Sequence, residues 1–161
     1  MKPISRTRPH TRDAYPHHTS IPTRWSDADR YGHINNAVYY HYFDTAVNRW
    51  LVEGGWLALA EPARIGLVVE TGCSFFAPAD FPDTLDAGLR VGRVGKSSVR
   101  FELALFRDEP TAIAPTAIAP TAIAQGHFTH VYVDARTRRP VALDEAFRKA
   151  LGTLALRAGR E

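Results

Sequence analysis

The sequence predicts an α+β fold in which an antiparallel β-sheet packs around one central α-helix. Two observations support this prediction. Residues 36–53 repeat apolar side chains with the period of a helix, and four later segments alternate apolar and polar residues as strands do. The chain of 161 residues is long enough for one domain with a sizeable core.

The central helix is bounded at both ends. Asn35 suits the N-cap position, and Gly54 stands where a helix commonly ends. Between them, apolar residues recur at spacings of three and four, which predicts one buried stripe; they are Tyr39, Tyr42, Phe43, Ala46, Val47, Trp50 and Leu51.

The predicted strands share a period of two. They cover residues 21–26, 65–76, 84–94, 97–107 and 126–134, and a weaker helical pattern covers 142–158. Such alternation suits an antiparallel sheet with one covered face. Because a single helix cannot cover so large a sheet, we expect a second subunit to cover the remainder.

Two segments depart from this pattern. Residues 1–20 are rich in Arg, His, Pro and Thr without an apolar period, so we expect a flexible lead-in before a domain at 21–158. Within that domain, residues 110–124 repeat the pentapeptide PTAIA three times. Proline at every fifth position breaks helices and sheet ladders, which predicts an expanded hairpin loop.

Composition narrows the possible functions. The net charge of +3 is small and scattered, which argues against a nucleic-acid partner. No apolar run reaches the roughly 20 residues of a membrane span. Cys73 is the only cysteine and no secretory signal is evident, so we expect a cytoplasmic protein. No cluster of residues has metal-ligand spacing.

Residues 27–36, with the sequence DADRYGHINN, are the most informative stretch. They precede the central helix, so a carboxylate here would stand beside the unpaired amides of a helix N-terminus. That arrangement combines a base or nucleophile with donors that can hold an oxyanion, as acyl transfer requires. Two aspartates two residues apart are explained equally well as simple turn caps.

The wider run of residues 21–36, continued by residues 38–40 and 43–46, resembles the 4-hydroxybenzoyl-CoA thioesterase family of hotdog-fold acyl-CoA thioesterases. The resemblance implies a hotdog fold, assembled as a homodimer or a dimer of dimers with active sites between subunits. It also implies hydrolysis of an acyl-CoA thioester to a free acid and CoA, with CoA as part of the substrate and no metal or redox cofactor.

The same resemblance implies roles for individual residues. In the family, the second acid of a D-x-D-x-x-G turn is catalytic; it matches Asp29, and the glycine matches Gly32. Asp29 would attack the thioester or activate a water molecule, and the backbone amide at Asn36 would polarise the carbonyl. His33 matches a histidine of the plant acyl-ACP thioesterases, but Tyr31 replaces their asparagine. His33 is therefore expected to position the substrate or to support the turn.

Substrate contacts are expected at six positions, namely Gly32, Asn35, Tyr39, Glu70, Lys96 and Ser97. Glu70 is an acid within an otherwise apolar strand, and a strand-edge or ion-paired glutamate also explains it. Lys96 and Ser97 occupy a hairpin turn that lies near the CoA tail in related thioesterases, although an ordinary polar turn explains them equally well.

Two other functions stay open at this point. The carrier of the acyl group could be acyl carrier protein instead of CoA. The chain could also be a hotdog module that binds acyl thioesters without hydrolysing them.

Overall fold

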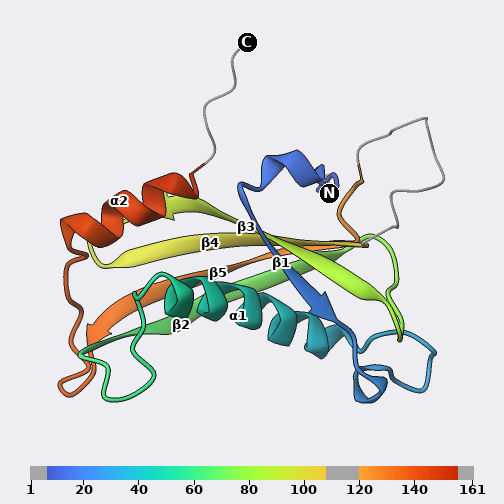
Figure 1. Ribbon diagram of the computed structural model, residues 1–161, viewed down its shortest axis with the longest axis horizontal. Helices are drawn as coiled ribbons and strands as arrows, with labels where there is room; N and C mark the ends of the chain where they lie inside the picture. The colour runs from blue at the N-terminus through green and yellow to red at the C-terminus, as the bar shows by residue number, and fades with distance from the viewer. Residues whose placement is uncertain (1–6, 108–119, 156–161) are drawn as a thin grey trace, which may run out of the picture.

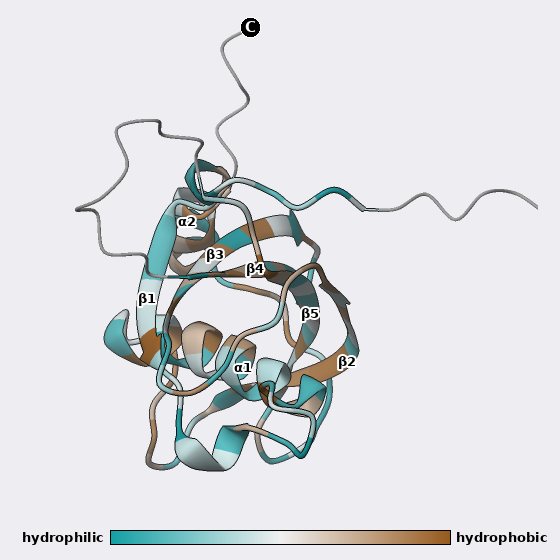
Figure 2. Cartoon of the chain, turned by 90° about the vertical axis from the view of Figure 1, so that its right-hand side faces the viewer, coloured by the Kyte–Doolittle hydropathy of each residue, from teal (hydrophilic) through white to brown (hydrophobic). Residues whose placement is uncertain are grey.

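The computed structural model describes residues 7–107 and 120–155. It contains one antiparallel sheet with the strand order β1-β3-β4-β5-β2, and the strands form an arc around the long helix α1 (Figures 1 and 2). The elements are β1 (His17–Pro22), α1 (Asn36–Glu53), β2 (Arg64–Phe75), β3 (Thr84–Val94), β4 (Ser98–Arg107), β5 (Ala124–Asp134) and α2 (Glu145–Thr153). The predicted α+β fold is confirmed.

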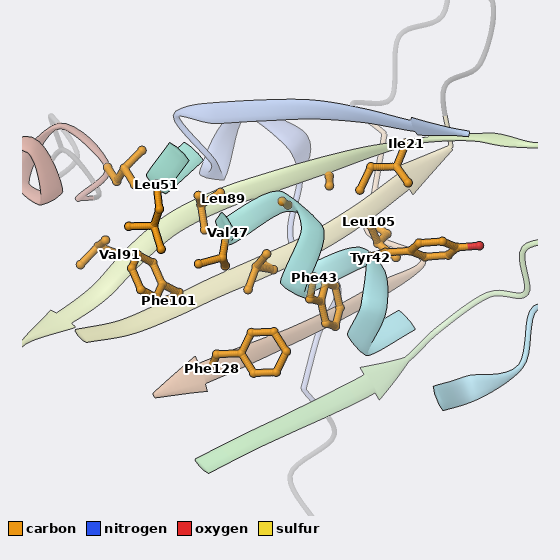
Figure 3. Close-up of a cluster of buried hydrophobic side chains, with 14 of the residues drawn as sticks. Ile21, Tyr42, Phe43, Val47, Leu51, Leu89, Val91, Phe101, Leu105 and Phe128 are labelled. Carbon is orange, nitrogen blue, oxygen red and sulfur yellow. The ribbon is translucent and has the colours of Figure 1, made fainter. Parts of the chain in front are cut away.

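The core lies between α1 and the inner face of the sheet. Phe43 and Val47 of α1 are completely buried and pack among Leu89, Phe101 and Leu105 of the central strands (Figure 3). The apolar stripe of α1 and every second residue of β3 and β4 therefore face each other. This confirms the helix and the alternating strands predicted from the sequence.

The first strand begins earlier than predicted. The structure places β1 at His17–Pro22, because these residues pair with Thr84–Leu89 of β3, whereas residues 25–27 form a short 3₁₀ turn. Tyr15 is buried against Phe106 on the face of the sheet away from α1. Tyr15 and the first residues of β1, which were expected to be part of the lead-in, are thus packed on the domain, whereas residues 1–6 lie outside the described residues.

The PTAIA repeats connect neighbouring strands. β4 and β5 pair with each other, as expected for the two sides of a hairpin, and residues 108–119 of the connection lie outside the described residues. In the last repeat, Ala122 and Ile123 are buried. α2 is shorter than the predicted 142–158 because Asp144 caps its first turn; residues 156–158 are not described.

The two ends of α1 lie at opposite ends of β2 (Figure 1). Tyr39, near the start of α1, contacts Phe75 at the end of β2, with the ring centroids 5.0 Å apart. β2 is also an edge strand, and its middle exposes large apolar side chains at Leu67, Val68 and Val69. In Figure 2, parts of β2 have the brown colour of hydrophobic residues.

None of the helices in the described ranges is long and apolar enough to cross a membrane.

Candidate active site

The turn before α1 is closed by backbone hydrogen bonds. The amide of Asp29 donates to the carbonyl of His33 at 2.9 Å, and Ala28 forms an isolated β-bridge with Ile34. Gly32 has a φ of +78°, a left-handed conformation that glycine adopts without a steric penalty. The turn therefore brings Asp29 next to the residues that lead into the helix.

Asp27 anchors this turn. It is 1% exposed, and its carboxylate accepts hydrogen bonds from the backbone and guanidinium of Arg24 and from the hydroxyl of Tyr42. Burial alone would raise the pKa of Asp27, but these donors outweigh burial and hold the pKa below its usual value. With its lone pairs occupied, Asp27 is a structural residue.

Asp29 differs from Asp27 in both burial and bonding. It is half-buried, and its Oδ1 accepts one hydrogen bond, from the amide of Tyr31 at 2.7 Å. Within the described chain, no donor bonds to Oδ2. This oxygen is therefore free to act on a ligand, and Asp29 lines a pocket of about 360 Å³.

The start of α1 supplies a backbone donor that has no acceptor inside the helix. The side chain of Asn35 caps the helix by accepting from the amide of Ala37 at 2.9 Å, as predicted. Asn36 is the first helical residue and is exposed. The amide of such a residue has no acceptor inside the helix, and the helix dipole adds partial positive charge there.

Four residues that line the Asp29 pocket were not predicted from the sequence as site residues, namely Trp25, Ala28, Asp80 and Phe81. The rings of Trp25 and Phe81 meet edge to face at 5.8 Å, and Trp25 is 81% exposed. An exposed tryptophan beside a carboxylate is a signal of binding, but exposure cannot be read from the sequence.

His33 lies in the same turn as Asp29. Its imidazole is exposed, while its backbone carbonyl accepts the bond from the Asp29 amide. Asp29, Gly32, His33, Asn35 and Asn36 are thus brought together at one end of α1. Their chemical roles stay predictions.

Tyr39 and Glu70 lie outside this cluster. Tyr39 is 3% exposed and belongs to the core one turn into α1. Glu70 lies on the face of the sheet away from α1, where its carboxylate meets His127 at 3.3 Å and Arg100 at 3.7 Å.

Lys96 and Ser97 lie at the opposite end of the sheet from Asp29. They form the β3–β4 turn, where the carbonyl of Lys96 accepts from Leu143 and that of Ser97 accepts from Tyr132. Within one subunit they are not brought together with Asp29, so the predicted contact with CoA would require a second subunit.

No group of three or more His, Cys, Asp or Glu side chains in residues 7–107 and 120–155 is arranged to hold a metal ion.

Comparisons with known proteins agree with this geometry. A family model described as the thioesterase-like superfamily matches residues 23–151. The crystal structure of the PA5185 protein from Pseudomonas aeruginosa strain PAO1 is 45% identical, covers 94% of this chain and 100% of its own, and superposes with a TM-score of 0.84. A search of curated proteins returns no match.

Two further structures are similar. A thioesterase from Thermus thermophilus, complexed with coenzyme A and Zn, is 26% identical over 90% of this chain and 98% of its own, with a TM-score of 0.70. The BH1999 gentisyl-coenzyme A thioesterase is 20% identical over 82% of this chain and 99% of its own, with a TM-score of 0.68, which supports the fold alone. The family model covers most of the chain, and the five-stranded antiparallel sheet with one long helix packed on it is the hotdog fold. The chain therefore belongs to the thioesterase-like superfamily and is a thioester hydrolase.

Proposed function

We propose that this protein hydrolyses an acyl-CoA thioester to a free acid and CoA. The observation that carries the proposal is the contrast between two neighbouring carboxylates. Asp27 is buried with its oxygens occupied, whereas Asp29 keeps one oxygen free in a pocket beside the start of α1. The relative from Thermus thermophilus, which holds coenzyme A, supports CoA as the carrier.

Asp29 has two routes to the same products. As a nucleophile, its carboxylate attacks the thioester carbon, the C–S bond breaks, and water then hydrolyses the resulting anhydride. As a general base, Asp29 takes a proton from a water molecule, whose oxygen attacks the same carbon. In both routes the CoA thiolate leaves and takes up a proton, and the chemistry uses only groups of the chain and water.

The amide of Asn36 is proposed to stabilise the oxyanion that forms in either route. It has no acceptor inside the helix and lies at the positive end of the α1 dipole, which is where such a charge is best stabilised. His33, exposed in the same turn, is proposed to position the substrate or the attacking water.

The active protein is proposed to be a homodimer joined through β2. An edge strand with exposed apolar residues is a template for pairing with another chain. Pairing of two β2 edges would extend the sheet and cover Leu67, Val68 and Val69. A dimer of dimers built from this unit stays a prediction.

Thiol release tests the proposal. Purified protein is incubated with short, long and aromatic acyl-CoA esters, and with acyl carrier protein esters of the same acyl groups. We expect catalytic release of CoA with at least one acyl-CoA. Faster turnover of the carrier-protein esters would show that the substrate is an acyl-ACP and not an acyl-CoA. Binding of CoA esters without thiol release would make the chain a non-catalytic module.

A further inference from the structure

A second cavity, of about 220 Å³, lies at the far end of α1 from Asp29. Its lining includes Asn48 of α1, Arg64 and Ile65 of β2, and His130 and Tyr132 of β5. Asn48 is twelve residues beyond Asn36, which corresponds to roughly 18 Å along the helix. In one subunit the two pockets are therefore separate.

Buried polar atoms in this cavity lack partners. His130 and Tyr132 are each 3% exposed, and neither ring nitrogen of His130 nor the hydroxyl of Tyr132 bonds to any group in the described part of the chain. Buried polar groups in native proteins are almost always paired, and an unpaired one costs about 1–3 kcal/mol. These atoms thus point to a ligand that the cavity receives.

The protonation states of His130 and Tyr132 determine which hydrogen-bonding groups a matching ligand carries. Burial lowers the pKa of His130 to about 4, so the imidazole is neutral at pH 7, with one nitrogen donating and the other accepting. Burial raises the pKa of Tyr132, so its hydroxyl keeps its proton. The matching group both donates and accepts hydrogen bonds, as a hydroxyl or a primary amide does.

A charged ligand does not fit. The charged side chain in the lining, Arg64, already donates to Asp144 at 2.7 Å and lies 4.7 Å from the centroid of the Phe147 ring. The other walls are largely apolar, with Leu51, Trp56, Leu57 and Ile65. Since a cavity of about 150 Å³ holds benzene, this one accommodates a ring with a polar substituent.

Pairing of two β2 strands would connect the cavity to the Asp29 pocket. The cavity lies at the start of β2, and the Asp29 turn lies beyond its end, where Phe75 contacts Tyr39 (Figure 1). If the β2 edges pair antiparallel, as all strands of this sheet do, the start of one β2 lies beside the end of the other. The Asp29 pocket of one subunit then adjoins the His130 cavity of the second.

We propose that the His130–Tyr132 cavity binds the distal end of the acyl group whose thioester is held at Asp29 of the other subunit, and that this end carries a hydroxyl or primary amide on an apolar body. The inference rests on the proposed function. It names the substrate class as acyl-CoA esters with a neutral polar terminus.

The binding test uses phenol and benzene as probes, with NMR shift changes as the readout. Because a net hydrogen bond contributes roughly 0.5–1.5 kcal/mol, we expect wild-type protein to bind phenol about tenfold more tightly than benzene, with the shifts centred on His130 and Tyr132. Tyr132→Phe and His130→Leu should each remove most of this preference. Tyr15→Phe, a buried tyrosine on the opposite face of the sheet, should retain it.

The kinetic test compares ω-phenylalkanoyl-CoA esters with their 4-hydroxyphenyl counterparts over a series of chain lengths. At the length that reaches the cavity, we expect kcat/KM to favour the hydroxylated ester by about tenfold, and Tyr132→Phe to reduce this ratio to near one.

The outcomes separate the two proposals. Equal binding of phenol and benzene, or a preference that survives both cavity variants, overturns the assignment of the cavity. Normal hydrolysis without a hydroxyl preference at any length overturns the acyl assignment and leaves the thioesterase intact. Absence of any thioester hydrolysis, with phenol still bound, overturns the proposed function and with it the acyl assignment.

Discussion

The hydroxyl of Tyr42 donates a 2.6 Å hydrogen bond to Oδ2 of Asp27. Tyr42 lies in the second turn of α1, and Asp27 lies in the segment that precedes the helix. This buried bond therefore fixes the Asp29 turn to the helix whose first amide is proposed to bind the oxyanion. The carboxylate proposed to react, Asp29, thus lies in a turn that the buried carboxylate of Asp27 anchors.

Removal of the Tyr42 hydroxyl should destabilise the fold. Tyr42→Phe leaves the buried Asp27 carboxylate with one donor fewer, and bonds to charged groups contribute about 1.5–3 kcal/mol. We expect a loss of that size in the free energy of unfolding, measured by urea denaturation at fixed protein concentration. Tyr40→Phe, at a half-buried position of the same helix, is the control. Equal stabilities of the two variants would show that the Tyr42–Asp27 bond does not anchor the turn.

The role of the Asn36 amide can be tested by proline. Proline is tolerated at the first position of a helix and removes only the N–H, and Asn35 already has the extended ψ of 136° that a residue before proline requires. Asn36→Pro should lower kcat about 100- to 1,000-fold relative to Asn36→Ala, which keeps the amide. Circular dichroism checks the helix. Similar kcat values in the two variants would exclude this amide as the oxyanion donor.

A charge in the middle of β2 should prevent dimerisation. Lysine on an edge strand disfavours pairing with another strand, so Val69→Lys should sediment as a monomer where the wild type sediments as a dimer. Ser20→Lys places the same charge at an exposed position of the opposite edge strand, β1, and should remain dimeric. If Val69→Lys stays dimeric while Ser20→Lys dissociates, the interface lies on β1.

His130 should make the stability of the unliganded protein depend on pH. The imidazole of His130 faces Asp44 of α1, Tyr132 of β5 and Arg64 of β2. Asp44 raises the pKa of His130, but burial lowers it by more. The folded pKa of about 4 lies below the ordinary value of 6.5. The unfolded chain thus takes up the proton first, and stability falls as the pH drops from 6.5 to 4.

The size of this effect follows from the shift in the pKa. Wild-type protein should lose about 3 kcal/mol more than His130→Leu between pH 7 and pH 4, measured by urea denaturation at each pH. Parallel losses in the two proteins would show that His130 is not desolvated as described.

Local periodicity predicted most of the fold. The stripe through Phe43 and Val47 identified α1, and alternation identified β3 and β4, because these elements each bury one face. The start of β1 was missed because His17 and His18 carry no apolar pattern; they are held by pairing with β3, which lies more than sixty residues away.

The site was predicted less completely. Motif spacing proposed Asp29 and Asn36, which lie in the turn before α1 and at its first helical position, and their roles stay predictions. The spacing of motifs did not show that Lys96 and Ser97 lie far from Asp29 and Asn36, because the position of a hairpin in a sheet depends on the strand order. It also missed the anchoring role of Asp27, which follows from long-range packing against Tyr42. A paired Glu70 was one interpretation of the sequence, but its partner across the strands, His127, was not identified.

Asp29→Asn shows whether the Asp29 carboxylate performs the reaction. Asparagine keeps the shape and the oxygen that accepts from the Tyr31 amide, so the melting temperature should match the wild type. We expect kcat for acyl-CoA hydrolysis to fall about 100- to 10,000-fold, whereas Glu53→Gln at the exposed end of α1 should retain wild-type activity. If the Asp29→Asn protein keeps the wild-type kcat, Asp29 is neither the nucleophile nor the general base.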